Sequence, residues 1–298
     1  MLSILIPVYN YDVTRLVKEL HSRATDTFVD FEIRVVEDGS TLFLAENKRI
    51  ASLPFCEYEI LTDNVGRSAI RNLLADKAKY NHLLFLDCDA EVSTTHFIEK
   101  YLPFCHDECV VIGGTAYEPG NNDPAYSLRL KYGRKREAKT ATEREKDGKY
   151  SHFSTFNFLI AKSVFQKIRF DETISGYGHE DTLFGHRIAE LRCEIHQIDN
   201  PLIHKGLDDN QTFIRKTEEG TRNLYLLYQT GRYPFLAKQS KLLQTFIQIK
   251  NKNLIRLFSA LYPLLKLSLY KNLTGKNPSL QLFDLYKLLF LAKTANKK

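Results

Sequence analysis

The sequence predicts an α/β protein with a mainly parallel sheet flanked by helices, followed by a C-terminal helical extension. Short and nearly continuous apolar runs alternate with helix-like segments in the first half, which is typical of strands buried on both faces. The chain has 298 residues, of which 43% are hydrophobic, so it can bury a large core. After residue 230, leucines recur at helical spacing between lysines.

The apolar runs predict strands at residues 2–8, 31–37, 58–61, 82–87 and 110–114. Helices are predicted between them, near residues 13–24, 42–53, 66–79 and 94–102. This order indicates a doubly wound sheet, in which ligands bind at the carboxyl ends of the strands. Residues 153–168 are predicted to form a strand and a helix, and residues 193–206 a strand that ends at a histidine. The charged residues 118–150 form either a surface loop with a short helix or a lid.

Charge is distributed unevenly along the chain, whose net charge is +6. Residues 231–298 hold thirteen Lys and Arg and one acid, Asp284, which gives +12, whereas the other residues hold 29 basic and 35 acidic side chains. This pattern predicts an anionic partner for residues 231–298, either a membrane surface or a nucleic acid. No nucleic-acid-binding module is recognisable, so the membrane is favoured. Packing on the body, or dimerisation, is the alternative.

Two features of residues 231–298 bear on their structure. Ser279 is predicted to cap a last helix that places Leu282, Leu285, Tyr286 and Leu289 on one face. Pro263 and the lysines argue against a helix that spans a membrane.

The five cysteines include one close pair, Cys105 and Cys109, and show no zinc-ligand spacing or disulfide framework. A reducing compartment is therefore expected. The first residues, MLSILIPVYN, resemble a strand rather than a secretory signal. Both observations predict a cytoplasmic location.

The stretch FLDCDAE ends the strand predicted at 82–87. In extended backbone, residues i and i+2 point the same way, so Asp87 and Asp89 are expected to face one site. Hard oxygen ligands suit Mg²⁺ or Mn²⁺, which often also hold substrate phosphates. The alternative is a loop whose acids cap a helix.

Two further motifs follow predicted strands. In VVEDGS, Asp38 either accepts a hydrogen bond from a nucleotide base or forms a turn in which Gly39 supplies a positive φ. In DNVGRSAIRN, Gly66 lies near a helix start, and Arg67 and Arg71 share one helix face. Arginines there suit a diphosphate or a base carbonyl, although a solvated basic face is the simpler interpretation.

GYGHED, at residues 176–181, has two interpretations. It is either an ordinary acidic helix start or a carboxylate pair held beside a sugar-sized pocket, with Tyr177 stacked on a sugar ring or packed in the turn.

Together, ILIPVYN, VVEDGS, DNVGRSAIRN, FLDCDAE, FNFLIAKSVFQKIRFDE and GYGHED make the sequence resemble the inverting glycosyltransferases of family 2. The six pieces occur in the family's order and cover roughly residues 1–206. The resemblance implies a GT-A fold and a nucleotide-sugar donor.

The resemblance also implies roles for the matching residues. Pro7, Tyr9 and Asn10 would lie at the nucleotide edge, Asp38 would bond the base, usually uracil, and Arg71 would help hold the base or diphosphate. Gly66 and Arg67, at the same helix start, are assigned to substrate binding by their position there and not by the resemblance. Asp89 would ligate Mn²⁺ or Mg²⁺, and Asp87 would approach the ribose or a metal-bound water, or ligate the metal itself. Asn157 would lie near the donor sugar or acceptor. Asp181 would be the catalytic base, Glu180 would contact an acceptor hydroxyl, and His204, a histidine that some relatives use, would be a further metal ligand.

The predicted function is metal-dependent inverting transfer of a hexosyl or N-acetylhexosaminyl group, from a UDP-linked donor to a saccharide or lipid-linked saccharide, in polysaccharide or glycan synthesis. The predicted catalytic domain is residues 1–230, with a nucleotide half near 1–115 and an acceptor half near 116–230. Residues 231–298 would attach it to the inner face of the plasma membrane.

Two alternatives remain open. A sugar-phosphate nucleotidyltransferase would be expected to have a glycine-rich loop after the first strand, but PVYNYDVTRL has no glycine. A non-catalytic membrane-binding protein that keeps the fold would have less reason to retain Asp38, Asp87, Asp89 and Asp181 together.

Overall fold

The computed structural model describes residues 1–148, 150, 153–174 and 176–296. The chain forms two compact units. The sheet unit comprises residues 1–118, 137–175 and 180–206, and the helical unit comprises residues 119–136, 176–179 and 207–298.

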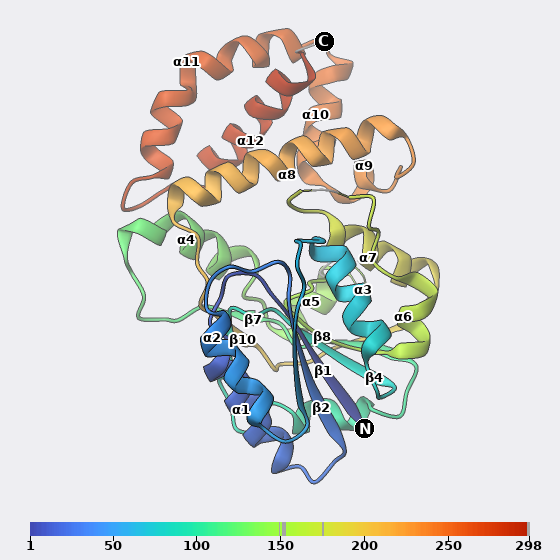
Figure 1. Ribbon diagram of the computed structural model, residues 1–298. Coiled ribbons are helices and arrows are strands. Elements are labelled where there is room, and N and C mark those ends of the chain that lie inside the picture. The colour runs from blue at the N-terminus through green and yellow to red at the C-terminus, as the bar shows by residue number, and fades with distance from the viewer. Residues whose placement is uncertain (149, 151–152, 175, 297–298) are drawn as a thin grey trace. The chain divides into compact units, whose positions relative to one another are not determined.

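A seven-stranded sheet forms the centre of the sheet unit, in the order β3-β2-β1-β4-β8-β6-β9 (Figure 1). The strands are β1 (Leu2–Val8), β2 (Phe31–Glu37), β3 (Cys56–Ile60), β4 (His82–Leu86), β6 (Cys109–Ile112), β8 (Asn157–Ala161) and β9 (Glu194–Gln197). Only β8 runs antiparallel to its neighbours in this sheet. The mainly parallel sheet and two of the predicted strands, 2–8 and 31–37, are confirmed.

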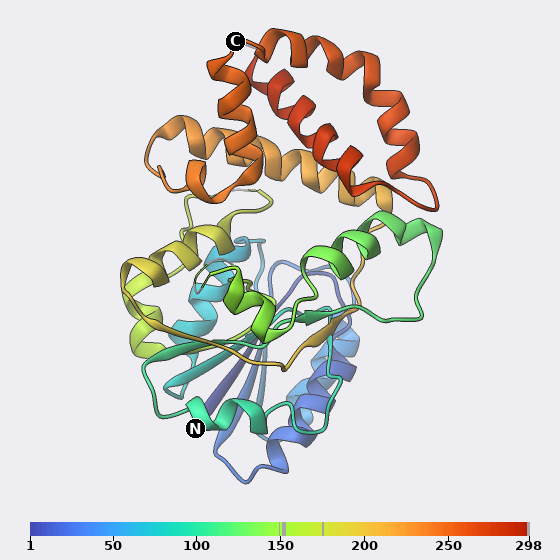
Figure 2. The same cartoon turned by 180° about the vertical axis from the view of Figure 1, so that it is seen from behind.

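Helices cover both faces of this sheet, as the views from front and back show (Figures 1 and 2). Even-numbered residues of β1 pack with α1 (Thr14–Thr25), through Leu16, Val17 and Leu20. The opposite face packs with α3 (Arg67–Lys77), α6 (Lys162–Ile168) and α7 (Glu180–Glu190). Side chains alternate between the faces along each strand, which explains why the buried strands are apolar throughout.

The sheet has a topological switch point between β1 and β4. Strands β2 and β3 lie on one side of β1, and β4 lies on its other side. The ladder between them ends at Leu5 and Phe85. Pro7 has no main-chain N–H to donate, and it lies beyond the end of the β1–β4 ladder. Ligands of open α/β sheets bind at such a switch point, beside the carboxyl ends of the strands.

A small second sheet brings distant segments together in the order β5-β10-β7. Its strands are β5 (Ala90–Glu91), β7 (Thr115–Ala116) and β10 (Leu202–His204). The single strand predicted at residues 193–206 is wrong: the structure has β9 in the large sheet and β10 in this one. His204 of β10 pairs with Ala90, beside the segment that follows β4.

Two predicted helices differ from the structure. Residues 42–53 form only α2 (Leu44–Asn47) and the 3-10 helix η1 (Lys48–Ser52), because the Asn47 side chain is buried and bonds Val13 N, Tyr11 O and Glu37. Residues 94–102 were expected to be helical, but the structure has the 3-10 helix η2 (Glu99–Phe104), where Pro103 is incompatible with a continuing α-helix.

Within residues 118–150, the structure has η3 (Pro124–Tyr126), α4 (Ser127–Arg136) and α5 (Ala141–Lys146). Residue 149 lies outside the described residues. In α5, Arg144 is buried and bonds Gln197 and the carbonyls of Lys139, Ile112 and Ile198. These hydrogen bonds hold α5 against the rest of the sheet unit, so this part of residues 118–150 is not a loose loop.

The helical unit is built around α12 (Leu280–Ala295), which contacts α4, α8 (Asn210–Thr230), α10 (Lys241–Asn251) and α11 (Ile255–Leu273). A short helix, α9 (Leu236–Gln239), precedes α10. The Asp209 side chain caps α8, which ends at Gly231 with φ 66°. The predicted Ser279 cap is confirmed, since its hydroxyl accepts from Leu282 N at 3.4 Å.

Within the described residues, none of the helices has both the length and the apolar character that crossing a membrane requires. The helical unit includes α8 as well as residues 231–296, so its contacts begin before the predicted boundary at residue 230. The functional division at that residue stays a prediction. Lys297 and Lys298 lie outside the described residues.

Candidate functional site

The loop after β1 is held against the loop after β2. Asn10 adopts a positive φ of 52°, and its Oδ1 accepts from the main-chain N–H of Thr41 at 2.7 Å and of Leu42 at 3.0 Å. Tyr9 directly precedes it and is 56% exposed. The strand end thus presents an accessible aromatic ring on a fixed loop.

Asp38 organises the entry to α3. Its two carboxylate oxygens accept from Val65 N at 2.6 Å and Gly66 N at 3.1 Å. Burial raises the pKa of Asp38, although these two hydrogen bonds oppose the rise. Gly66 has φ 90°, a conformation that favours glycine, and precedes the first residue of α3. Asp38 and the DNVG segment therefore form one unit at the strand edge.

Arg71 contacts Asp87 directly. Its Nη2 donates to Asp87 Oδ1 at 2.5 Å, and its Nη1 donates to the carbonyl of Arg67 at 3.1 Å. Burial raises the pKa of Asp87; Arg71 opposes this rise and Asp89 adds to it. Arg71 itself is buried, and its Nε has no partner among the described residues. Helix α3 thus fixes the first carboxylate of the FLDCDAE motif.

The expectation that Asp87 and Asp89 lie on one extended strand is wrong. Strand β4 ends at Leu86, and residues 88–89 form a turn in which Ala90 N donates to the Asp87 carbonyl at 3.3 Å. Because the backbone turns, the two carboxylates meet different partners. Asp87 contacts Arg71, whereas Asp89 contacts His204.

Asp89 and His204 form the second contact of this motif. His204 Nε2 lies 3.0 Å from Asp89 Oδ2, and its Nδ1 lies 3.4 Å from the Tyr117 hydroxyl. Tyr117 in turn donates to Glu137. The imidazole also packs on Phe156, with ring centroids 5.1 Å apart. A chain of side chains therefore fixes the orientation of His204.

Gly206 leaves room for this arrangement. A Cβ at residue 206 would lie 2.3 Å from Asp89 Oδ2, and the main-chain N–H of Lys205 donates to the Asp89 carbonyl at 2.8 Å. Any side chain at residue 206 would displace the Asp89 carboxylate.

The donor atoms of Asp89 and His204 fit a divalent cation. Neighbouring ligand atoms at right angles on a six-coordinate ion lie about 3 Å apart, since each is about 2.1 Å from the metal. The carboxylate oxygen and the imidazole nitrogen have that separation. In the described part of the chain, no group of three or more His, Cys, Asp or Glu side chains could hold a metal. In this structure the same 3.0 Å separation is that of a hydrogen bond between Asp89 and His204, and a pair of protein ligands is what Mg²⁺ commonly takes beside water and substrate oxygens.

The carboxylate pair of GYGHED begins α7. Glu180 is buried and lies 3.4 Å from Arg67 Nη1, so it links α7 to α3. Asp181 is half-buried, and its Oδ1 accepts from Thr182 N at 2.6 Å. Acids in the first turn also suit the positive end of the helix.

The glycines and Tyr177 belong to the helical unit, where α8 holds them. Gly176 and Gly178 have φ of 84° and 91°, which favour glycine. Glu219 accepts from Tyr177 N at 2.9 Å, Asn223 donates to the Tyr177 carbonyl at 3.0 Å, and Lys216 lies over the tyrosine ring. The turn is thus stiffened by side chains that the sequence motifs did not include.

Asn157 is enclosed at the start of β8. Its Oδ1 accepts from Tyr101 at 2.5 Å, and its Nδ2 donates to the carbonyls of Gly114 and Asn200. The residue is 2% exposed, so these contacts give it a structural role in crosslinking strands. Its predicted contact with the donor sugar or acceptor stays a prediction.

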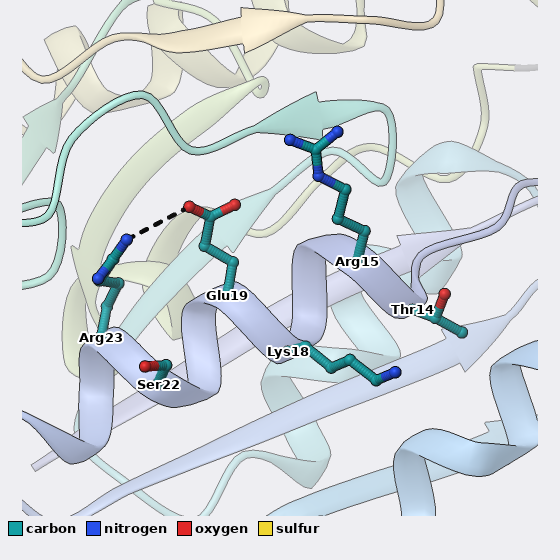
Figure 3. A pocket seen from close by; sticks show the side chains of 6 residues that line it. All are labelled: Thr14, Arg15, Lys18, Glu19, Ser22 and Arg23. Carbon is teal, nitrogen blue, oxygen red and sulfur yellow. Dashed lines mark ion pairs between the residues drawn. The ribbon is translucent and has the colours of Figure 1, made fainter.

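A surface depression elsewhere in the sheet unit runs along α1 (Figure 3). Arg15, Glu19 and Arg23 lie on the same side of the helix, with Glu19 and Arg23 paired at 3.5 Å. Its lining residues, Thr14, Arg15, Lys18, Glu19, Ser22 and Arg23, contain no predicted site residue. This depression is separate from the carboxylates described above.

Sequence reasoning missed five contributing residues: Tyr117 and Glu137 beside His204, Gly206 beside Asp89, and Glu219 and Asn223 beside the GYG turn. Only the glycine after the late histidine carries a local signal, HKG, and that signal is weak alone. The others are recognisable only once the chain is folded.

The doubly wound sheet, with acidic side chains at the carboxyl ends of β2 and β4, places a candidate ligand site at the switch point between β1 and β4. Residues 3–169 match the model of glycosyl transferase family 2, which is more than half of the chain. The chain therefore belongs to that family. Asp181 and His204 lie beyond the matched residues.

Two curated relatives are named as uncharacterized glycosyltransferases. One, from Rickettsia felis, is 29% identical over 124 residues, which is 42% of this chain and 20% of the relative. The other, from Rickettsia bellii, is 26% identical over 129 residues, covering 42% of this chain and 18% of that protein. The matches thus span about a fifth of the relatives' own length.

Solved structures share the fold. A mannosyltransferase from Pyrobaculum calidifontis, in complex with GDP-Man and Mn²⁺, superimposes with a TM-score of 0.61 at 15% identity, over 99% of this chain and 86% of that chain. TarS 1–349 of S. aureus, in complex with UDP-GlcNAc, gives 0.52 at 16% identity, over 97% and 90% of the two chains. The expected GT-A fold is confirmed.

Proposed function

We propose that the protein is a metal-dependent inverting glycosyltransferase that moves a hexosyl or N-acetylhexosaminyl group from a UDP-linked donor to a hydroxyl of a saccharide or lipid-linked saccharide. The reaction would serve polysaccharide or glycan synthesis. One observation carries the proposal: in a chain of family 2, Asp38, Asp87 and Asp89 follow β2 and β4 at the carboxyl edge of the sheet. The nucleotide sugars in the two solved relatives support this class of donor.

The donor would bind across the loops after β1 and β2. The exposed ring of Tyr9 can stack on a base, and Pro7 and Asn10 shape the same edge. The Asp38 oxygens accept backbone N–H groups, but each carboxylate oxygen has a second lone pair for a base N–H. Gly66 and the half-exposed Arg67 begin α3, where a diphosphate is favoured.

Asp89 and His204 would hold Mn²⁺ or Mg²⁺ together with diphosphate oxygens, with Asp87 toward the ribose or a metal-bound water. The cation would supply positive charge that stabilises the departing nucleoside diphosphate. Arg71 would hold Asp87 in place, and the Tyr117 and Glu137 contacts would hold the His204 ring.

Asp181 would act as the catalytic base. A sugar hydroxyl is a poor nucleophile until a carboxylate accepts its proton in the transition state. Glu180 is buried against Arg67, so it is suited to position the acceptor, whereas Asp181 is half-buried. Attack on the face opposite the leaving group inverts the anomeric centre. Tyr177 would stack on a sugar ring.

The helical unit would attach the enzyme to a membrane. Residues 231–298 carry the excess of positive charge, which favours an anionic surface, and a lipid-linked acceptor would be reached there. We propose a peripheral location at the inner face of the plasma membrane.

A donor screen tests the proposal. We expect one UDP-sugar with Mn²⁺ or Mg²⁺ to raise the melting temperature of the protein, and a transfer assay with that donor to release UDP. If every sugar nucleotide left the melting temperature unchanged, the proposal would fail. Release of pyrophosphate from a nucleoside triphosphate would instead favour a nucleotidyltransferase.

A further inference from the structure

Helix α11 has two apolar faces, one buried and one exposed. Its inner face packs in the core of the helical unit, where Tyr262, Leu269 and Leu273 are buried. The α12 side chains Phe283, Tyr286 and Phe290 belong to the same cluster. Figures 1 and 2 show α11 running beside α12 at the edge of this unit. The inner face therefore accounts for the folding of this helix.

The outer face of α11 is apolar without being buried. Leu257, Leu264 and Leu267 are 53%, 74% and 81% exposed. They are seven and three residues apart, so they lie on one side of the helix. Leu265 and Pro263 beside them are also exposed. Exposed leucines grouped on one side of a helix favour a site that another molecule covers.

Cations flank these leucines. Arg256 and Lys271 are exposed on α11 itself, and Lys252 is exposed just before it, whereas Lys266 lies toward the inner face, over the ring of Tyr262. The only acid in residues 231–298 is Asp284. Asp284 accepts hydrogen bonds from Arg136, at 2.6 and 2.9 Å, and lies 2.9 Å from Lys287. The partner of this surface is therefore expected to be both apolar and anionic.

A second copy of the chain does not meet this requirement. Pairing two copies through α11 would bring two strongly basic surfaces together, which like charges oppose. A nucleic acid would neutralise the lysines but would leave the leucines uncovered. A bilayer with acidic phospholipids supplies both an acyl region for leucines and headgroup phosphates for lysines.

We propose that the outer face of α11, formed by Leu257, Leu264, Leu265 and Leu267, is a membrane-docking surface for anionic phospholipids. The helix lies in the plane of the interface, with the leucines among the upper acyl chains and the cations at the headgroups. This inference rests on the proposed membrane association of residues 231–298, but it does not depend on the transfer reaction.

Vesicle binding by the full chain tests the surface. The first variant is Leu264→Ser/Leu267→Ser, and the matched control is Phe28→Ser/Leu42→Ser, which removes two exposed side chains of the sheet unit (97% and 55% exposed). With vesicles of phosphatidylcholine and phosphatidylglycerol, we expect the first variant to bind at least about tenfold more weakly than the wild type. The control should bind like the wild type, and vesicles of phosphatidylcholine alone should bind much more weakly.

Three results would overturn the inference. Equal vesicle binding by the leucine variant and the wild type would exclude this face while leaving membrane association intact. No binding by the wild type would exclude both. A wild-type dimer in sedimentation velocity, dissociated by the leucine substitutions, would assign the face to a second copy. The donor-induced rise in melting temperature reports on the transfer proposal separately, because it needs no membrane.

Discussion

The two adjacent carboxylates that begin α7 have different surroundings. Glu180 is 8% exposed and faces Arg67, whereas Asp181 is half-buried and contacts its neighbour Thr182. A base that accepts a proton from a bound hydroxyl must be reachable by that hydroxyl. These surroundings suit Asp181 to the proposed role of catalytic base. They suit Glu180 to the proposed role of positioning the acceptor.

We expect Asp181→Asn to lower kcat for transfer by about 10²- to 10⁴-fold, because the amide cannot accept the proton. The rise in melting temperature caused by the nucleotide sugar should be retained, since the base acts on the acceptor. Glu180→Gln is the matched control and should lose less activity. Near-normal turnover by Asp181→Asn would show that another group is the base.

His204 is the second residue whose role can be tested directly. Excess chelator should stop transfer, and His204→Ala should weaken Mn²⁺ binding measured by titration calorimetry. Tyr117→Phe removes the hydroxyl next to Nδ1 and should weaken that binding by roughly 10- to 100-fold, the usual effect of losing a residue that orients a ligand. Undiminished transfer in chelator would contradict metal dependence, and unchanged affinity in His204→Ala would remove the residue from the metal site.

At the scale of elements, the turn after β4 shows what the sequence could not predict. The strand was predicted because its apolar run is continuous, but the direction of Asp87 and Asp89 depends on a turn set by tertiary contacts. Arg71 comes from α3 and His204 from β10, so the different partners of the two carboxylates are recognisable only when those elements are in place. The same holds for the helix predicted at residues 42–53. Buried Asn47 is the last residue of α2, and the chain continues from there as a 3-10 helix.

One pair of helices in the helical unit is joined by charge. Arg136 of α4 donates two hydrogen bonds to Asp284 of α12. Burial acts to raise the pKa of Asp284, but the hydrogen bonds from Arg136 and Lys287 outweigh it and lower the pKa to about 2. A carboxyl whose pKa is lowered by folding stabilises the fold above its unfolded pKa, and that contribution is lost as pH falls through the folded pKa.

We therefore expect Asp284→Asn to lower the free energy of unfolding by about 1 kcal/mol at pH 7, a modest value because solvent screens the half-exposed pair. The difference from the wild type should shrink as pH falls from about 4 toward 2, where the wild-type carboxyl also becomes neutral. Melting temperatures at several pH values measure this. A difference that is constant with pH would assign the effect to packing rather than to charge.

At the scale of the molecule, the sequence predicted the mainly parallel sheet with its flanking helices, whereas the packing of distant helices depends on features that it does not show locally. The parallel sheet was recognisable because buried strands are apolar throughout, and α8 carries its own signals, the Asp209 cap and Gly231. Neither signal reveals that α8 packs with α4, α12 and the GYG turn. Packing between helices that are distant in the sequence depends on how their side chains fit together in the folded chain. A local sequence pattern such as a helix cap does not show this.

The predicted division at residue 230 leads to a last test. Phe213 and Ile214 of α8 and Leu128 of α4 share one apolar cluster with Phe283 and other side chains of α11 and α12. Each large side chain that such a cluster buries contributes about 1.5 to 3 kcal/mol. A chain that ends at Thr230 loses those partners, although the whole predicted catalytic domain is retained. It also exposes the side of α8 that packs on α12. Glu219 and Asn223, which hold Tyr177, belong to the same helix.

We expect the chain ending at Thr230 to bind a hydrophobic dye and to be cleaved by protease within α8, because α8 has lost the apolar partners that cover it. Limited proteolysis and dye fluorescence, with the full chain as reference, measure these changes. If the shortened chain instead melted cooperatively at the temperature of the full chain, residues 1–230 would be an independent domain. In that case the contacts of α8 with α12 would contribute little to its stability.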